Sequence, residues 1–151
     1  MNTIFLFLLF LISIITKFIF SNFISFITIN GNSMFPTLKH KDKILVKKSK
    51  TYNPNDLIVI KLDHILIIKR IIGISGDQIA LKHNLVYKNN ILLSEPYIYS
   101  QKTLGLNSYK TIDENCYFVM GDNRNYSLDS RDKTIGQIHV SQIIGKVFFK
   151  I

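Results

Sequence analysis

The sequence predicts a mostly β protein, in which an N-terminal transmembrane helix is followed by a small antiparallel barrel or sandwich-like domain. Three observations predict this fold. Residues 1–22 hold a long, almost uncharged apolar run, and the rest of the chain consists of short β-branched runs separated by turn residues. With 151 residues, the chain has room for one β domain beside the helix but not for a second full domain. We therefore divide it into an anchor over residues 1–22 and a β-rich domain over residues 23–151.

The anchor is predicted from its length and its lack of charge. A helix needs roughly 20 apolar residues to cross the bilayer core. Residues 3–21 can supply them if Lys17 extends its amine to the membrane interface. A cleaved signal peptide is the alternative, but no basic segment precedes the apolar run and no small-residue cleavage pattern follows it. We therefore expect an uncleaved single anchor.

Runs of β-branched and aromatic residues predict strands along the rest of the chain. These strands lie at residues 23–29, 43–47, 57–62, 64–75, 78–81, 85–87, 91–93, 116–120, 138–140 and 143–151. Turn residues separate them, among them the cluster at 51–56 and the pair Asn89-Asn90. Residues 94–115 have no clear periodicity, and we interpret them as a long surface connection.

The composition limits the classes of partner. A net charge of +9 suggests an anionic partner, either nucleic acid or a membrane surface with acidic lipids. The densest lysines, at residues 39–50, are interrupted by Asp42 and an apolar run, as in a strand with solvated flanks. We therefore favour a membrane surface over nucleic acid. Cys116 is the only cysteine, which excludes an intrachain disulfide, and the four histidines lack metal-ligand spacing.

Residues 31–38, Gly-Asn-Ser-Met-Phe-Pro-Thr-Leu, join the anchor and first strand to the rest of the chain. Pro36 fixes its own φ and favours an extended conformation at Phe35, while Gly31 permits a close backbone approach. We expect the Ser33 hydroxyl on an irregular turn between extended segments. A serine held in this way can act as a nucleophile, although serine near proline and glycine is also ordinary turn chemistry.

Lys69 and Arg70 stand in the most apolar predicted strand. Successive side chains of a strand point to opposite faces, so at least one of these cations lies among apolar neighbours. Lys69 can sit at a strand edge with its amine in water. If it is instead desolvated, burial lowers the pKa of the amine and makes it a usable general base for a hydroxyl nucleophile.

The third candidate segment is residues 121–131, Gly-Asp-Asn-Arg-Asn-Tyr-Ser-Leu-Asp-Ser-Arg. It directly follows an apolar strand and carries more polar side chains than a loop needs. An exposed turn stabilised by Asp129 and Arg131 is the purely structural explanation. The alternative is a third part of the same site.

Together these segments resemble the motifs of a known family. The residues are Gly31-x-Ser33-Met34-x-Pro36-Thr37-Leu38, Lys69-Arg70-Ile-Ile-Gly73-x-x-Gly76-Asp77, Gly121-Asp-Asn-Arg124-x-x-Ser127-x-Asp129-Ser130-Arg131 and Gly145-Lys146. In this order, and with an anchor before them, they resemble the type I signal peptidases, which are membrane serine proteases with a Ser-Lys pair. Ser75 departs from the proline that is usual before Gly76. The short chain resembles the minimal, single-anchor members.

The resemblance implies that Ser33 is the catalytic nucleophile and Lys69 its general base, in place of the histidine of a Ser-His-Asp triad. It also implies a substrate-binding groove that Met34 and Pro36 help to form. The backbone N–H of Ser33 would donate to the oxyanion. Gly31 occupies the position at which many relatives add a side-chain hydroxyl.

Supporting roles are implied for five further residues. Ser127 would hydrogen-bond the lysine amine, and Asp129 would form an ion pair with Arg131. Asp122 and Arg70 would also shape the site. The resemblance implies no metal ion and no other cofactor for this chemistry.

The implied function is removal of N-terminal signal peptides from exported preproteins, with cleavage after small residues through an acyl-enzyme. The chain would be a single-pass protein of the bacterial cytoplasmic membrane, in contact with its lipids, with the β-rich domain on the outer side. Lys39 and Lys41 follow the anchor and Lys17 lies toward its C-terminal end, and counting these lysines predicts the opposite orientation. We favour the outer location because this bias is small and long folded domains translocate largely regardless of charge.

Other functions fit part of the sequence. One is a conjugative-transfer peptidase of the same family. A self-cleaving repressor-type Ser-Lys protease would be soluble, and the anchor and the Asp-Asn-Arg motif argue against it. A non-catalytic, anchored basic β domain would require the motif match to be a coincidence or the site to be inactive. Convergence of Ser33, Lys69 and Ser127 would favour an enzyme.

Overall fold

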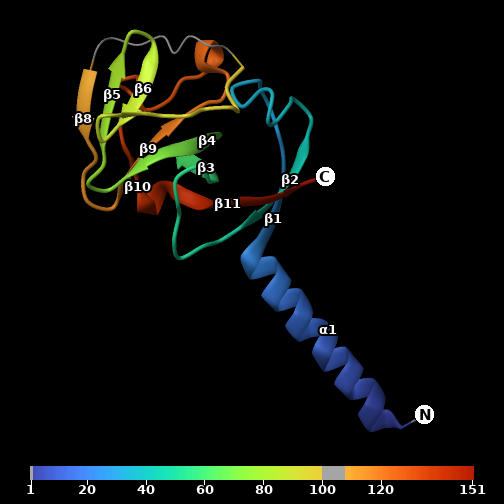
Figure 1. The fold of residues 1–151 in the computed structure, drawn as a ribbon. Helices are drawn as coiled ribbons and strands as arrows, with labels where there is room; N and C mark the ends of the chain where they lie inside the picture. The colour runs from blue at the N-terminus through green and yellow to red at the C-terminus, as the bar shows by residue number, and fades with distance from the viewer. Residues whose placement is uncertain (1, 100–107) are drawn as a thin grey trace.

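The computed structural model describes the backbone of residues 2–99 and 108–151, with the side chains of all of these except residues 19–24, 108 and 109. A long helix, α1 (Thr3–Phe23), opens the chain and runs directly into the first strand. Figure 1 shows α1 projecting from a body made of strands, with the N-terminus at the far end of the helix.

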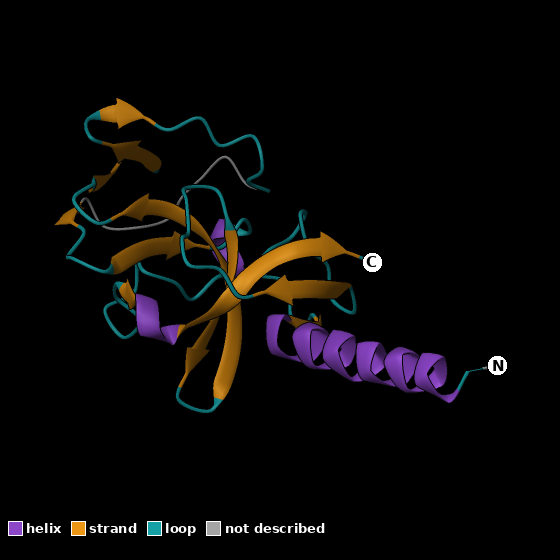
Figure 2. Ribbon diagram, turned by 90° about the horizontal axis from the view of Figure 1, so that it is seen from below, coloured by secondary structure: helices purple, strands orange, loops and turns teal. Residues whose placement is uncertain are grey.

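The body is built from short strands. In chain order they are β1 (Ile24–Thr28), β2 (Lys43–Lys47), β3 (Leu57–Leu62), β4 (Ile65–Ile74), β5 (Gln78–Lys82), β6 (Leu85–Lys88), β7 (Ile91–Leu92), β8 (Ser108–Thr111), β9 (Cys116–Met120), β10 (Ile138–His139) and β11 (Ile143–Lys150). Two 3-10 helices of the described residues, η1 (Arg124–Tyr126) and η2 (Val140–Gln142), lie near the C-terminal strands. Figure 2 shows α1 to one side of the strands.

The strands of the described residues form two antiparallel sheets. The larger sheet has seven strands in the order β1-β2-β11-β3-β4-β9-β10, and the smaller has four in the order β7-β6-β5-β8. The long strand β4 pairs with β3 from Ile65 to Arg70 and with β9 from Arg70 to Ile74. The chain then turns into β5 of the smaller sheet. The predicted mostly β, antiparallel fold class is confirmed.

Residues with positive φ close three of the hairpins. Asp63 begins the turn between β3 and β4 with φ of 46°, and His83 and Asn84 join β5 to β6 with φ of 50° and 62°. Asn89 and Asn90 join β6 to β7 with φ of 52° and 65°. Asparagine and aspartate tolerate this conformation better than most residues, so such pairs are typical of tight hairpin turns. The turn predicted at Asn89-Asn90 is confirmed.

Strand β3 crosses the centre of the larger sheet and is buried on both faces. Ile58, Val59 and Ile60 are each 0% exposed. Val59 packs in one core cluster with Met34 of the 31–38 turn, and Ile58 and Ile60 belong to a separate cluster. Because successive strand residues point to opposite faces, a continuous apolar run of this kind fits a strand covered on both sides. The Ser33 turn is thus attached to the centre of the sheet through its neighbour Met34.

Several strand ends differ by one residue from the predicted bounds, and two differences need separate mention. Helix α1 continues through Phe23, so the first strand begins one residue later than predicted. The predicted surface connection at 94–115 contains β8, which pairs with β5; part of that prediction, residues 100–107, lies outside the described residues. Among the residues that the structure describes, no helix is long and apolar enough to cross a membrane. The transmembrane anchor over residues 1–22 stays a prediction.

Candidate active site

The 31–38 segment forms the predicted irregular turn, and buried side chains fix it in place. Met34 and Leu38 are each 2% exposed, and the Leu38 N–H donates to the Met34 carbonyl at 2.9 Å. Gly31 has φ of +117°, a conformation that residues with a Cβ rarely adopt. The side chain of Ser33, between these fixed points, is half-buried.

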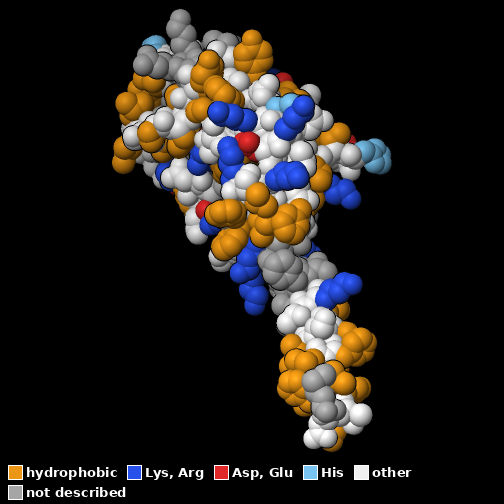
Figure 3. Space-filling view, turned by 90° about the vertical axis from the view of Figure 1, so that its right-hand side faces the viewer, with side chains coloured by type: hydrophobic (Ala, Val, Ile, Leu, Met, Phe, Trp, Pro, Cys, Tyr) orange, Lys and Arg blue, Asp and Glu red, His pale blue; other side chains and the backbone are white. Residues whose placement is uncertain are grey.

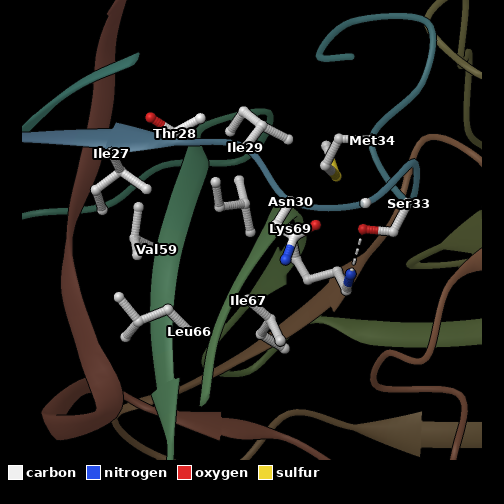
Figure 4. Close-up of a pocket in the computed structure, with 12 residues that line it drawn as sticks. Ile27, Thr28, Ile29, Asn30, Ser33, Met34, Val59, Leu66, Ile67 and Lys69 are labelled. Atoms are coloured by element: carbon white, nitrogen blue, oxygen red, sulfur yellow. Dashed lines mark hydrogen bonds between the residues drawn. The ribbon is translucent and has the colours of Figure 1, made fainter. Parts of the chain in front are cut away.

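Lys69 lies in β4 opposite Ile58, one residue before β4 begins to pair with β9. The residue is only 3% exposed, so its amine does not extend into water. Lys69 Nζ lies 2.8 Å from Ser33 Oγ, within hydrogen-bond distance (Figure 4). Within the part of the chain that the structure describes, this is the only hydrogen bond of the amine. The strand and the turn therefore bring together two residues that lie 36 positions apart.

Burial lowers the pKa of the Lys69 amine from its usual 10.5 to about 8, because the ammonium form loses its hydration. The charge of Asp129 raises the pKa, that of Arg131 lowers it, and that of Asp122 raises it again. Desolvation outweighs the two carboxylates. The neutral amine is consequently accessible near neutral pH, and this is the form that can take a proton from the Ser33 hydroxyl.

A cleft of about 260 Å³ opens beside Ser33 and Lys69. Figure 4 shows the pair at one end of it and the apolar side chains of Ile27, Val59 and Leu66 farther along. The complete lining consists of Ile27, Thr28, Ile29, Asn30, Gly31, Ser33, Met34, Val59, Leu66, Ile67, Ile68 and Lys69. Met34 lines the cleft as predicted. Pro36 is exposed on the turn and lies outside the lining.

Two strand edges border the cleft. Consecutive residues of the chain line it at 27–31 and at 66–69, so both segments turn an edge toward it rather than one face. Among the described residues, β1 pairs only with β2, and β4 pairs only with β3 between Ile65 and Lys69. The backbone groups on these free edges can bind an extended peptide in the manner of an added strand.

The 121–131 loop lies against the Ser33 turn. The Asn123 N–H donates to the Ser33 carbonyl at 3.0 Å, and its Nδ2 donates to the Asn32 carbonyl at 3.1 Å. A Cβ added to Gly121 would lie 2.5 Å from the Ser33 carbonyl oxygen, so glycine is needed for this close approach. The loop thereby fixes the backbone of the candidate nucleophile.

Asp129 is the centre of the hydrogen bonds within this loop. The residue is 1% exposed, and its carboxylate accepts from the Gly121 N–H at 2.9 Å, from Ser127 Oγ at 2.7 Å and from Arg131 Nε at 2.8 Å. The predicted ion pair between Asp129 and Arg131 is therefore present. Ser127 donates to Asp129, and the described residues include no hydrogen bond between Ser127 and Lys69. This differs from the expected geometry because the Asp129 carboxylate is the stronger acceptor beside the hydroxyl.

Arg70 points away from Lys69 and is also buried, at 8% exposure. Its guanidinium donates to both carboxylate oxygens of Asp122, from Nε at 2.8 Å and from Nη2 at 2.6 Å, and from Nη1 to the Asn55 carbonyl at 2.9 Å. Thr37 Oγ1 donates to the same carboxylate at 2.5 Å. Arg70 is thus a compensated buried cation, whereas the Lys69 amine faces the cleft and Ser33.

This geometry agrees with what is known of similar proteins. The family model described as "Signal peptidase, peptidase S26" matches residues 2–151. The chain belongs to this signal peptidase family. Signal peptidase I of Bacillus caldolyticus is 38% identical over 154 residues, which cover 88% of this chain and 80% of the relative. Signal peptidase I S of Bacillus subtilis is 33% identical over 146 residues, which cover 87% and 77%.

A solved structure supports the same family. A signal peptidase I from Enterococcus faecalis matches with a TM-score of 0.56 and 25% identity, over 66% of this chain and 98% of that chain. As a member of the signal peptidase family, the chain is a hydrolase, a serine peptidase that removes signal peptides from preproteins. This function agrees with the predicted one and replaces the repressor-type and non-catalytic alternatives.

Sequence reasoning did not identify several residues that the structure places at or near the site. The cleft-lining side chains of β1, β3 and β4 were recognised as strand residues but not as part of a groove. Asn123 belongs to the 121–131 motif, but the motif alone does not indicate that this residue makes two hydrogen bonds to the Ser33 turn. Glu95 was placed in a surface connection. Its one available signal was composition, because the chain has only two glutamates, Glu95 and Glu114.

Proposed function

We propose that Ser33 is the nucleophile of this signal peptidase and that Lys69 is its general base. The observation that carries this proposal is the 2.8 Å approach of Lys69 Nζ to Ser33 Oγ, made by a lysine that is 3% exposed. A buried amine with a pKa of about 8 is a far better base near neutral pH than an ordinary lysine.

The proposed reaction proceeds through an acyl-enzyme. Ser33 Oγ attacks the scissile carbonyl carbon while its proton moves to Lys69 Nζ. The C–N bond then breaks, and the Lys69 ammonium returns the proton to the leaving amine. A water molecule, deprotonated by the same amine, hydrolyses the ester and restores the Ser33 hydroxyl. We propose the Ser33 N–H as one donor to the developing oxyanion.

The residues around the pair hold it in this arrangement. Asp129 and Arg131 form the rigid centre of the 121–131 loop, and Ser127 is attached to Asp129. Asp122 and Arg70 tie the same loop to β4 through a buried bidentate ion pair. Burial is the main cause of the lowered Lys69 pKa, and the charges of Asp129, Arg131 and Asp122 modify it, so these three residues influence the charge of the amine as well as its position.

The cleft is the proposed binding site for the residues before the scissile bond. A signal peptide bound in extended form along a free edge would place alternate side chains against the apolar lining. The cleft adjoins the Ser33–Lys69 pair, and we propose that cleavage follows small residues, as the family resemblance implies. Met34 is the only side chain of the 31–38 turn besides Ser33 that lines the cleft, so we propose it as a substrate contact.

The direct test is cleavage of a purified preprotein by the full-length chain in detergent micelles or lipid vesicles. We expect the wild type to release the signal peptide, with the mature N-terminus identified by sequencing, and the Ser33→Ala variant to release none. Cleavage by a folded Ser33→Ala variant at the wild-type rate would exclude Ser33 as nucleophile.

The pH dependence of cleavage follows from the Lys69 pKa. A general base must be neutral, and the neutral fraction of an amine grows as pH rises through its pKa. We expect kcat/KM to rise tenfold per pH unit below about 8, the pKa given by burial of Lys69, and to level off above it. The measurement is a rate profile from pH 6 to 9.5 with folding checked by circular dichroism. A rate that falls steadily across this range in folded protein contradicts a lysine base.

We also propose that α1 anchors the chain to a membrane and that the adjacent sheet face contacts lipid. The described apolar side chains of α1 are exposed around the helix, Ile4 and Phe18 at 68% each among them. On the outer face of the sheet, Phe26 of β1 and Phe149 of β11 both lie opposite Leu45 of β2, and these two phenylalanines are 66% and 61% exposed. Figure 3 shows hydrophobic and basic side chains gathered on the body next to the helix. Apolar side chains flanked by lysines suit an interface with acidic lipids.

The proposed location of the β-rich domain is the outer side of the bacterial cytoplasmic membrane, where exported preproteins emerge. Lysine counting predicts the inner side, so the two predictions separate cleanly in one experiment. In intact spheroplasts, we expect external protease to digest residues 23–151. Full protection until the membrane is broken would place the domain inside and contradict this location.

A further inference from the structure

A buried ion pair joins Arg124 of the 121–131 loop to Glu95, which lies outside the motifs that identify the family. Glu95, in the segment between β7 and β8, accepts from Arg124 Nη1 at 2.9 Å and from Nη2 at 2.5 Å. The side chains of Arg124 and Glu95 are 0% and 7% exposed. A buried guanidinium without a carboxylate partner is strongly unfavourable, and Glu95 supplies a carboxylate to Arg124.

Arg124 in turn fixes the start of the 121–131 loop. Its Nε donates to the Gly121 carbonyl at 3.0 Å, while the Gly121 N–H donates to Asp129 at 2.9 Å. Both polar groups of Gly121 are therefore held by charged side chains. The Arg124 carbonyl also accepts from Arg131 Nη2 at 2.7 Å, which links it to the partner of Asp129. Gly121 lies against the Ser33 carbonyl, to which the Asn123 N–H of the same loop also donates, so a displacement of Arg124 can reach the Ser33 turn through one residue.

The rest of the 95–99 segment fixes the other side of the loop. Tyr97 Oη donates to Glu95 at 3.0 Å, and its ring lies 4.0 Å from the guanidinium of Arg70. The Tyr99 N–H donates to the Asp122 carbonyl at 3.1 Å. Glu95 therefore stands between two buried arginines, one bonded directly and the other contacted through Tyr97.

We propose that Glu95 is a positioning residue for the cleavage reaction. It holds Arg124, and through Arg124 the Gly121 peptide, in the place that aligns Ser33 with Lys69. This inference rests on the proposed roles of those two residues. The lining of the cleft includes neither Glu95 nor Arg124. Loss of Glu95 should therefore lower kcat and leave KM nearly unchanged.

The test compares the same substitution at the two glutamates of the chain. Glu95→Gln keeps the size of the side chain and removes its charge, and Glu114→Gln does the same at an exposed position. With a peptide substrate and full-length protein in micelles, we expect Glu95→Gln to lower kcat about 10- to 100-fold, the usual cost of a small misplacement of reacting groups. KM should change less than about twofold, and Glu114→Gln should match the wild type in both constants.

A double-mutant cycle separates positioning from general stability. If Glu95 acts through Arg124, the variant Glu95→Gln/Arg124→Gln should lose less activity than the product of the two single losses, because both singles break one unit. Additive losses, a raised KM with unchanged kcat, or a Glu95→Gln enzyme that is folded and matches Glu114→Gln would each overturn the proposal.

A substitute variant and a parallel control measurement keep the test decisive. If Glu95→Gln does not fold, Tyr97→Phe can be used instead, because it removes one hydrogen bond to Glu95 and keeps the aromatic ring. We expect Tyr97→Phe to lower kcat about 2- to 10-fold. An unchanged kcat would assign Glu95 a structural role only. Wild type and Ser33→Ala, measured in parallel, report on the proposed nucleophile independently. Activity in Ser33→Ala would reject the nucleophile, whatever the Glu95 variants do.

Discussion

Ser33→Ala and Lys69→Ala are each expected to abolish signal-peptide cleavage while the protein stays folded. The first removes the nucleophile, and the second removes the only group within hydrogen-bond distance of Ser33 Oγ in the described residues that can take its proton. Removal of a nucleophile or its base in serine proteases lowers kcat by about 10⁴- to 10⁶-fold. The measurement is single-turnover cleavage of a labelled preprotein over several hours.

Two further substitutions at Lys69 separate its charge from its packing. Lys69→Met keeps an unbranched apolar side chain in the buried site and should fold at least as well as the wild type, because no amine has to be desolvated. Lys69→Arg keeps the positive charge but should be inactive, since a guanidinium does not give up its proton in a protein. Wild-type activity in either variant would assign the base to another group.

Asp129→Ala is expected to cause the largest loss of stability among the site variants. It leaves Arg131, whose side chain is 10% exposed, without its carboxylate and removes the acceptor of the Gly121 N–H and of Ser127 Oγ. Breaking a buried ion pair from one side costs about 3–5 kcal/mol of unfolding free energy. For a chain of this size that corresponds to a fall in Tm of about 6–20 °C, measurable by thermal unfolding, and activity should fall with it.

Three other variants allow the loss of stability in Asp129→Ala to be compared with larger and smaller structural changes. Arg131→Ala should resemble Asp129→Ala, because it leaves the buried carboxylate uncompensated. Ser127→Ala removes one hydrogen bond to a carboxylate and should cost only about 1–3 kcal/mol. Asp113→Ala, at an exposed aspartate, should leave Tm unchanged. Equal melting temperatures for Asp129→Ala and Asp113→Ala would mean that the ion pair has no structural role.

The parts of the fold that local sequence determines could be predicted. Strands such as β3 and β9 are continuous β-branched or aromatic runs, and the turn at Asn89-Asn90 uses residues that tolerate positive φ. Strand β8 could not be predicted, because its Ser-Tyr-Lys-Thr sequence has no strong strand pattern and its backbone is paired by β5. Helix α1 ends at Phe23, one residue beyond the predicted anchor, because apolar residues continue across the boundary between helix and strand.

The candidate site shows the same division. The alternation of Lys69 and Arg70 on a strand predicted that the two cations face opposite sides, and they do. Arg70 can be buried because Asp122 compensates its charge. Asp122 lies 52 residues away in the sequence, so the residues around Arg70 do not indicate it. Glu95 and Arg124 are 29 residues apart, so their ion pair could not be predicted from the sequence around either residue. The hydrogen bond expected between Ser127 and the lysine depends on a rotamer that the neighbouring Asp129 decides.

The most direct test of the Ser33–Lys69 pair is the titration of the Lys69 amine itself. The chain can be labelled with ¹³C at the lysine Cε positions, and the resonance of Lys69 can be assigned among the 16 lysines by its absence from Lys69→Met. Its chemical shift is then followed from pH 6 to 11 in the folded, full-length protein. The structure predicts a midpoint of about 8, because burial disfavours the ammonium form. A midpoint at the usual 10.5 would show a charged amine at working pH and contradict Lys69 as the general base.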